Sequence, residues 1–484
     1  MPKSKLPPMR DLHFGRVSAR DERTQDSNLV RDAYYDLNGA ALRITTGDAW
    51  ALLGPKGSGK SYVFEYLDEA WANDFDRFVS RWDLDGFPVI DVRYLQVGLR
   101  LGPASTRRSW EIMLLLKIVS ALQRDSNLTH SAQFRSVVES VRASGILDSP
   151  FESKFAAWSK NDMAFPESSN LTASSTMSGI EFSNVIKESL KALSTSSRHV
   201  FLVDGLDSFF GQSDEQLESL ASLAEAALDI NSFLAECGLA MSVVLAVRAD
   251  MFTQLPSTDI AKLRDHAVEL DWTPGGLTDA NKLWDLANLK AQVSTSGREY
   301  GKKIKDIRLD YLAERVITRP VNNVSEYLLS NTRLLPRDLI ALLNTVKEAH
   351  GGSSLVSEET AKAAVRLYSE TYFISEISNN LTKVLDQNSA SKVAAFIEAL
   401  TTLPSRFFSI QDVANEVDGV LSQREIRALL HQMFRVGGLG VQVGNGPVRN
   451  TNFVFRRIGG GGFSINGEYS LHNALVEAWN LNRY

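Results

Sequence analysis

The chain has 484 residues, of which 44% are hydrophobic and 23% are charged, and its formal net charge is −6. This length predicts two or three globular domains, and the negative charge excludes a protein that coats nucleic acid through bulk charge. The single cysteine, Cys237, excludes an internal disulfide, and no apolar run approaches the roughly 20 residues of a membrane helix.

The N-terminal 27 residues are polar and charged and contain Pro2, Pro7 and Pro8. We predict that residues 1–27 start as a flexible arm, which packs near residues 14–22, and that a short helix follows over 29–41. No apolar secretory segment follows the first basic residues. Together with the cysteine count, this favours a cytoplasmic protein with no membrane partner.

The most informative stretch is AWALLGPKGSGKSYVFEYL, residues 49–67. It places GxxxxGK[ST] between a predicted strand and a predicted helix, which is the setting of a phosphate-binding loop. Glycines let backbone N–H groups surround phosphate oxygens, and the following helix directs its positive end at the anion. Lys60 is expected to reach the β and γ phosphates, and Ser61 to ligate Mg²⁺. The predicted nucleotide-binding residues are Gly54, Pro55, Lys56, Gly57, Ser58, Gly59, Lys60, Ser61 and Tyr62.

The segment that follows alternates one predicted strand with helices. The β-branched and aromatic run PVIDVRYL predicts a buried strand over 88–95. We expect helices over 107–123, 130–144 and 183–193, within an insertion spanning about 106–195. Residues 168–179, SSNLTASSTMSG, lack periodicity and predict a loop or disordered insertion.

The stretch HVFLVDGLD predicts a second site element. The apolar run 200–203 leads directly into Asp204, as a buried strand does when its tip places a carboxylate beside Mg²⁺. Asp207 is a candidate for orienting or deprotonating the attacking water. Many buried strands end in Asp, so the assignment depends on the upstream phosphate-binding loop.

The strand MSVVLAV over 241–247 ends on Arg248. A planar guanidinium suits bidentate phosphate binding, so Arg248 is a candidate sensor of the γ phosphate. The alternative is an arginine at a strand end that pairs with Asp250. A last strand is expected over 267–272.

The chain beyond residue 272 predicts a helical lid, with helices over 278–292, 307–316, 324–329, 337–350 and 358–378. The sequence LPRDL starts one of them with Pro336 in its first turn. Arg337 could reach nucleotide from the lid, or could pair with Asp338 or another neighbour instead.

The last hundred residues predict a winged helix, because three short helices over 392–403, 410–417 and 422–436 precede glycine-rich VQV, FVF and FSI segments. The third helix has an apolar face made by Ile426, Leu429, Leu430, Met433 and Phe434. The cations that it and the presumed wing present are candidate DNA contacts: Arg424, Arg427, His431, Arg435, Arg449, Arg456 and Arg457.

The charge of the chain is unevenly distributed. Residues 421–484 hold seven arginines and three glutamates, a net charge of +4, which leaves −10 for the remainder. This asymmetry is typical of a DNA-contacting module on an acidic ATPase. A solvated helix face, or a winged helix that docks a protein, has the same composition.

Several motifs together resemble a bacterial P-loop ATPase family of the STAND and AAA+ type with a C-terminal winged helix: FGRVSARDE, LLGPKGSGKS, VFLVDGLD, LAVRADMF, VELDW, LLPRDLIALLN and YSLHNAL. The resemblance spans the chain from Phe14. It implies ATP binding, slow hydrolysis and self-assembly, with Arg248 and Arg337 as sensors. It also implies a regulated switch of the kind that bacteria use against phage. Gly205 and Ser208 depart from the family, which has Glu at the first position and often an acidic residue at the second.

The predicted fold class is α/β: a P-loop NTPase core with a parallel sheet, then a helical lid and a C-terminal winged-helix domain. The predicted parts are an arm over 1–27, the core over 28–272, the lid over 273–385 and the winged helix over 386–484. The favoured function is an ATP- and Mg²⁺-dependent switch that forms a homo-oligomer, with an effector protein encoded nearby as a candidate partner. The alternatives are an initiator- or loader-type ATPase acting on duplex DNA, and a non-catalytic scaffold that ATP stabilises.

Overall fold

The computed structural model describes residues 6–94, 102–129, 131–143, 145–147, 151–160, 164–166, 174–176, 179–209, 213–274, 277, 280–293, 304–313, 323–350, 352, 355–382, 384–385, 390–417, 419–443, 450–454, 462–464 and 467–481. The chain divides into two compact units. Unit 1 takes the described residues of Met1–Tyr35, Gly57–Gly59 and Asp271–Tyr484, and unit 2 those of Asp36–Lys56 and Lys60–Leu270.

Unit 2 is built on a five-stranded sheet in the spatial order β2-β5-β6-β1-β7, in which all neighbours are parallel. Its strands are β1 (Ala51–Leu53), β2 (Arg77–Asp83), β5 (Arg198–Asp204), β6 (Met241–Val247) and β7 (Ala267–Glu269). Parallel strands need crossovers, and helices supply them on both faces. The sheet confirms the predicted α/β class with a parallel P-loop core.

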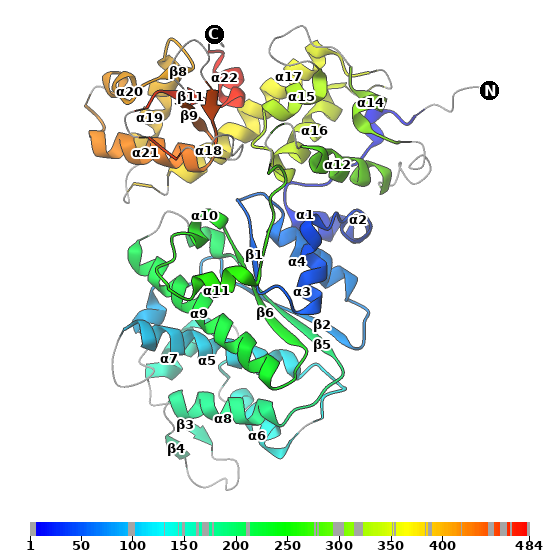
Figure 1. Ribbon diagram of the computed structural model, residues 1–484, viewed down its shortest axis with the longest axis vertical. Coiled ribbons are helices and arrows are strands. Elements are labelled where there is room, and N and C mark those ends of the chain that lie inside the picture. The colour runs from blue at the N-terminus through cyan, green and yellow to red at the C-terminus, as the bar shows by residue number, and fades with distance from the viewer. Residues whose placement is uncertain are drawn as a thin grey trace, which may run out of the picture. The chain divides into compact units, whose positions relative to one another are not determined.

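The helices of unit 2 form the rest of its core. In Figure 1, α9 lies in front of the sheet with α5 beside it, and their apolar side chains form one buried cluster with β1, β5 and β6. The helices are η2 (Leu37–Gly39), α3 (Ala40–Thr46), α4 (Lys60–Ala70), η3 (Asp91–Tyr94), α5 (Pro103–Leu122), α6 (Ala132–Ala143), α7 (Phe151–Lys160), α8 (Gly179–Lys191), η4 (Leu206–Phe209), α9 (Asp214–Glu236), α10 (Ala249–Phe252) and α11 (Ile260–Asp265). A hairpin of β3 (Ala164–Pro166) and β4 (Ser174–Thr176) lies partly in the predicted loop 168–179.

The strand predicted over 88–95 was wrong. The structure places the edge strand at β2, while residues 91–94 form the 3-10 helix η3. β2 was missed because an edge strand keeps a polar, partly exposed face, and RFVSRWD therefore lacks the apolar run of a buried strand. The sequence also did not reveal α9. The single helix predicted over 29–41 was wrong, because α2 ends at Asp32, residues 34–36 are not helical, and Asn38 and Gly39 adopt positive φ angles.

Unit 1 contains the lid helices, and the N-terminal segment packs against them. Its elements to residue 381 are η1 (Met9–Asp11), α1 (Ala19–Gln25), α2 (Ser27–Asp32), α12 (Asn281–Val293), α14 (Ile307–Tyr311), α15 (Val324–Ser330), α16 (Pro336–His350), α17 (Glu358–Tyr368), the π-helix η7 (Ser369–Phe373) and α18 (Ile374–Leu381). Met9, Leu12 and Phe14 are buried, and Glu22 forms a buried ion pair with Lys290. The burial of Phe14 and Glu22 agrees with the packing predicted near residues 14–22. Met9 and Leu12 are also buried, so the packed part begins earlier than predicted, because these apolar side chains are covered by the lid.

The C-terminal part of unit 1 combines four helices with a four-stranded antiparallel sheet in the order β10-β9-β11-β8. Its elements are α19 (Ala390–Thr402), β8 (Phe407–Phe408), α20 (Ile410–Glu416), α21 (Gln423–Arg435), β9 (Leu439–Val443), β10 (Asn450–Asn452), β11 (Tyr469–Leu471) and α22 (Asn473–Trp479). This order agrees with the predicted winged helix. The VQV segment lies in β9. The predicted FVF and FSI segments lie partly outside the described residues, and β10 and β11 were not predicted at their observed positions.

Within the described residues, no helix is long and apolar enough to cross a membrane.

Candidate nucleotide-binding site

The phosphate-binding loop follows a strand that lies inside the sheet. β1 is buried and pairs with β6 on one side and β7 on the other, so the loop leaves the sheet at the carboxyl ends of its strands. Gly57 and Gly59 have φ angles of 88° and 100°, which only glycine adopts readily. The first turn of α4, with Lys60, Ser61 and Tyr62, follows directly. The predicted strand, loop and helix are therefore confirmed as local structure.

Lys60, the predicted phosphate-binding lysine, folds back against its own loop. Its side chain is buried, and Nζ donates to the carbonyl oxygens of Gly54 at 3.1 Å and Pro55 at 3.2 Å. The ammonium group thus lies against the same loop that is predicted to bind phosphate. Ser58 is fully buried, and its Oγ has no hydrogen-bond partner within the described residues.

The remaining loop residues differ in exposure. Pro55 and Ser61 are exposed, whereas Lys56 and Tyr62 are half-buried. The Ser61 hydroxyl is therefore accessible to a ligand at the start of α4. The backbone of Ser58 is anchored because its carbonyl accepts from Trp272 Nε1 at 2.8 Å.

Asp204 ends β5, as predicted, and faces a second acidic strand end. In the sheet register Asp204 pairs with Asp83, the last residue of β2, and Asp204 Oδ1 accepts from the Gly205 N–H at 2.9 Å. Asp83 was not predicted as a site residue because strand β2 was not predicted. The carboxylate that directly follows the segment RFVSRW was the feature that could have indicated it. Among the described residues, no group of three or more His, Cys, Asp or Glu could hold a metal by itself.

Gly205 occupies a position that excludes every side chain. Its φ angle is 84°, and a Cβ there would lie 2.3 Å from the Asp85 backbone nitrogen and 2.4 Å from Asp83 Oδ1. A glutamate at this position would require the turn after β2 to move. The close packing of the ends of β2 and β5 therefore explains why this chain has glycine where the resembling family has glutamate.

Asp207 lies in η4, directly after this turn. Its side chain, like that of Ser208, lies outside the described part of the structure. The water-positioning role of Asp207 stays a prediction.

Arg248 follows β6, the strand between those of the phosphate-binding loop and Asp204. The N–H of its neighbour Ala249 donates to Gly54 O at 3.3 Å, which places the strand end beside the loop. The Arg248 side chain is buried and forms a two-pronged pair with Asp250, through Nε at 3.0 Å and a terminal nitrogen at 2.9 Å. The predicted location is correct, and the alternative partner Asp250 is present.

Arg337 contacts the phosphate-binding loop within unit 1. Its backbone N–H approaches Gly57 O at 3.4 Å, and a Cβ added to Gly57 would lie 3.2 Å from Arg337 Cβ. Asp338, the alternative partner of Arg337, is occupied by Arg333, which donates to both carboxylate oxygens at 2.8 and 2.6 Å. Burial raises the pKa of the Tyr372 phenol and Asp338 raises it further, so Tyr372 stays protonated and donates to Asp338 at 3.2 Å.

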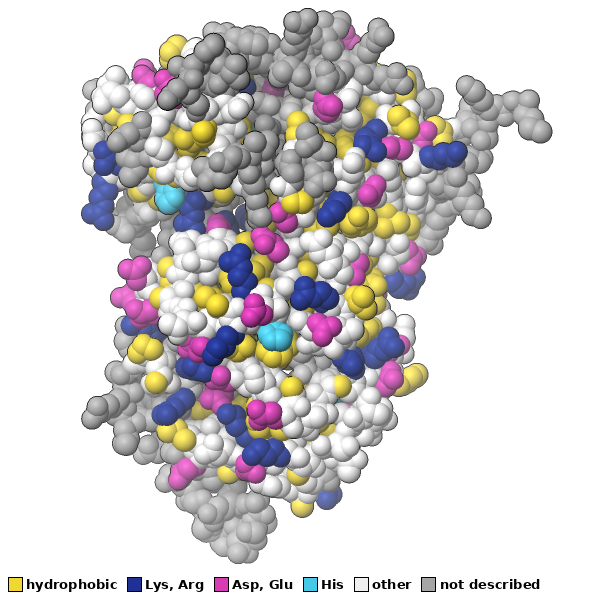
Figure 2. Space-filling model, in the orientation of Figure 1, with side chains coloured by type: hydrophobic (Ala, Val, Ile, Leu, Met, Phe, Trp, Pro, Cys, Tyr) yellow, Lys and Arg dark blue, Asp and Glu magenta, His cyan; other side chains and the backbone are white. Residues whose placement is uncertain are grey.

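The third helix of the predicted winged helix, α21, presents its arginines outward as predicted, but His431 is not the cation that the sequence predicted. Its five apolar residues are buried, Arg424, Arg427 and His431 are exposed, and Arg435 is half-buried. Figure 2 shows dark-blue and cyan side chains gathered over the position of α21 in Figure 1. Burial lowers the pKa of His431 and the Arg435 charge lowers it further, so His431 is neutral at pH 7. Arg449, Arg456 and Arg457 lie outside the described residues.

Comparisons with known proteins add little to this site. No protein-family model and no curated protein matches the chain. Among solved structures, it is similar to Cdc6p from Pyrobaculum aerophilum at 11% identity, with a TM-score of 0.30, over 89% of this chain and 87% of that one. A TM-score of this size supports no inference about function, so the assignment depends on the residues themselves.

Proposed function

We propose that this chain is an ATP-binding, slowly hydrolysing switch of the STAND and AAA+ type, which couples its nucleotide state to conformation and self-assembly. One observation carries the proposal: the glycine loop, the buried Lys60 and the ends of β5 and β6 come together at one edge of a parallel sheet. Ligands of open parallel sheets bind at this edge. Glycine backbone and a lysine at a helix start are the groups that hold a triphosphate.

The residues at this edge fit Mg²⁺ and ATP. The positive φ angles of Gly57 and Gly59 turn the loop so that backbone N–H groups can surround phosphate. Ser61 and Asp204 would hold the ion, which neutralises phosphate charge when bound. Lys60 would exchange its two carbonyl partners for phosphate oxygens.

Slow turnover follows from Gly205. General bases contribute about 10²- to 10⁴-fold to proton transfer, and the turn that holds Gly205 has no room for one. Asp207 is left as the candidate for positioning water.

Arg248 and Arg337 would make the conformation of the protein depend on the bound nucleotide. Each would bind the γ phosphate, which ADP lacks, and a ligand shifts a conformational equilibrium only by its differential affinity for the two states. Self-assembly, an effector partner and a role in phage defence come from the sequence resemblance alone and remain predictions.

The decisive experiment compares Lys60 with a lysine outside the loop. Lys60→Ala is expected to abolish Mg²⁺-ATP binding in calorimetry, whereas Lys191→Ala on the exposed face of α8, a matched loss of one ammonium, is expected to retain it. Circular dichroism checks that both variants fold. Tight ATP binding by Lys60→Ala would refute the assignment.

A second function, contact with duplex DNA, is favoured by the exposed Arg424 and Arg427 on α21. Reversing both to Glu is expected to remove weak, salt-dependent binding. The logarithm of its binding constant should fall with the logarithm of the salt concentration, with a slope of about −0.9 per phosphate neutralised. Reversing the exposed Arg10 and Arg20 changes the net charge equally and is the control. If the wild-type protein does not bind duplex at low salt, α21 has another role.

A further inference from the structure

The loop 330–335, which begins with the last residue of α15, is followed by Pro336 and Arg337 in the first turn of α16. Its backbone is strained, because Leu334 has a φ angle of 56° while its side chain is buried. A non-glycine residue in this region costs on the order of 1–3 kcal/mol and persists only where the surroundings hold it. The contacts of this loop therefore show what holds it.

From one side, the loop is held by the start of α22 in the C-terminal domain. The buried His472 caps α22, because its Nδ1 accepts the Ala474 N–H at 3.1 Å. Nε2 therefore carries the ring proton and donates to Thr332 O at 3.1 Å. Asn473 Nδ2 donates to Ser330 O at 3.0 Å. Two consecutive residues of the C-terminal domain thus bind two carbonyls of the loop.

From the other side, the loop is tied to the first turn of α16. Asp338 accepts the Arg333 backbone N–H at 3.0 Å as well as both guanidinium bonds. Arg337 is the residue before Asp338, so the position of the loop sets the position of the arginine. Figure 1 shows α22 beside α17, above α16.

The neighbouring π-helix η7 completes the connection. Its last residue, Phe373, stacks on the His472 ring with centroids 4.7 Å apart, and the Arg333 guanidinium lies 5.4 Å from the same phenyl ring. Within the described residues, the buried Tyr368 hydroxyl and Ser369 Oγ beside it have no hydrogen-bond partner. π-helical turns often occur at functional sites. Unsatisfied buried groups lower the cost of rearranging this region.

We propose that His472 and Asn473 are positioning residues for Arg337, so that the C-terminal domain and the γ-phosphate-sensing arginine are energetically coupled through the 330–335 loop. The inference rests on the proposed nucleotide function of Arg337. Coupling between two sites is reciprocal. A partner that displaces α22 from the loop would therefore lower the affinity for ATP, and bound ATP would stabilise the contact between the loop and α22.

The test measures the affinities of the full chain for Mg²⁺-ADP and for a non-hydrolysable ATP analogue by calorimetry. Asn473→Asp removes the donor at constant size, and a carboxylate in the first turn of α22 is favourable there, so the helix is retained. The expected result is analogue binding about tenfold weaker, with ADP binding unchanged. Asn415→Asp on the exposed face of α20 introduces the same charge away from the loop and is expected to change neither affinity.

A double variant separates positioning from stability. Arg337→Ala is expected to weaken analogue binding, and adding Asn473→Asp is expected to cause no further loss, because both act through one guanidinium. Additive losses, equal losses for ADP and analogue, or an unchanged analogue affinity in Asn473→Asp would overturn the coupling. If Asn473→Asp lowers the unfolding midpoint sharply, Asn473→Ser gives the same readout.

Failure of the proposed function has a different signature. The wild-type chain would then bind neither nucleotide, or Arg337→Ala would leave the ratio of ADP to analogue affinity unchanged. Either result removes the basis of the coupling as well.

Discussion

Each of the two units has an arginine–aspartate pair at or next to a predicted sensor arginine, and the two pairs differ in how completely they are buried. The side chains of Arg333 and Asp338 are 6% and 0% exposed, whereas those of Arg248 and Asp250 are 4% and 29% exposed. Both arginines donate two hydrogen bonds to one carboxylate. The difference therefore lies in the solvation of the aspartate.

This difference in solvation makes the Arg333–Asp338 ion pair costly to break and the Arg248–Asp250 ion pair easier to exchange for another partner. If Arg333 left Asp338, a carboxylate would remain buried without its counter-charge, which costs several kcal/mol. If Arg248 turned toward a phosphate, Asp250 would remain partly hydrated. Arg333 is therefore suited to hold the first turn of α16, and Arg248 is suited to change partners when a triphosphate binds.

The largest effect is expected for Asp338→Asn. It leaves the buried Arg333 guanidinium with only the more distant Glu376 carboxylate, 3.9 Å away, as a counter-charge. The free energy of unfolding should therefore fall by at most about 3–5 kcal/mol. Denaturant unfolding of unit 1, followed by tryptophan fluorescence, measures the loss. Arg333→Met together with Asp338→Leu removes both charges and should cost less than Asp338→Asn alone. If the single variant is as stable as the wild-type chain, the pair is not the fixed connection described here.

An intermediate effect is expected for Asp250→Asn. The amide keeps the Oδ1 acceptor for the Met251 N–H, and because Asp250 is partly hydrated the loss of stability should be on the order of 1 kcal/mol. The variant should bind the non-hydrolysable ATP analogue more tightly, because Arg248 no longer has an anionic competitor for phosphate. Weaker analogue binding would show that Asp250 orients Arg248 for its ligand.

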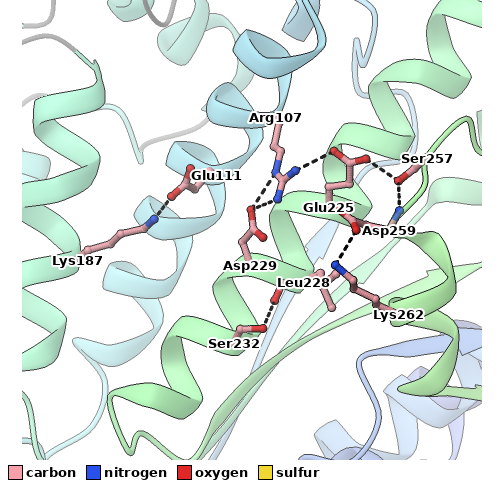
Figure 3. Close-up of polar contacts among 10 residues, drawn as sticks. All are labelled: Arg107, Glu111, Lys187, Glu225, Leu228, Asp229, Ser232, Ser257, Asp259 and Lys262. Carbon is pink, nitrogen blue, oxygen red and sulfur yellow. Dashed lines mark hydrogen bonds and ion pairs between the residues drawn. The ribbon is translucent and has the colours of Figure 1, made fainter.

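The smallest effect is expected where all charges are partly exposed. Arg107 on α5 pairs with Glu225 and Asp229 on α9, and Glu225 also accepts from Ser257 (Figure 3). Because the arginine and the two carboxylates are all partly solvated, Arg107→Met should cost at most about 1 kcal/mol. The cost should shrink further in high salt. Thermal unfolding at two ionic strengths measures this, and a large salt-independent loss would show that Arg107 contributes to packing.

Local rules explain which site residues the sequence could predict. The loop Gly54–Tyr62 and the strand ends at Asp204 and Arg248 were predictable, because glycine conformation, a helix start and an apolar run ending in a polar residue act within ten residues. The apolar face of α21 was predictable for the same reason, since helical periodicity is local. Edge strand β2, and with it Asp83, was not predictable from an apolar run, because a half-exposed strand has a mixed composition.

The sequence by itself therefore determined the P-loop core, the order of lid and C-terminal helices, and the residue types available to bind phosphate. Only the tertiary structure decided the partners. It decided that Lys60 is buried against Gly54 and Pro55, that Asp338 pairs with Arg333, that no side chain fits at Gly205, and that His472 reaches Thr332 across 140 residues of sequence. The physical reason is that burial and hydrogen-bond partnership depend on which distant segments pack together, and no local pattern encodes that choice.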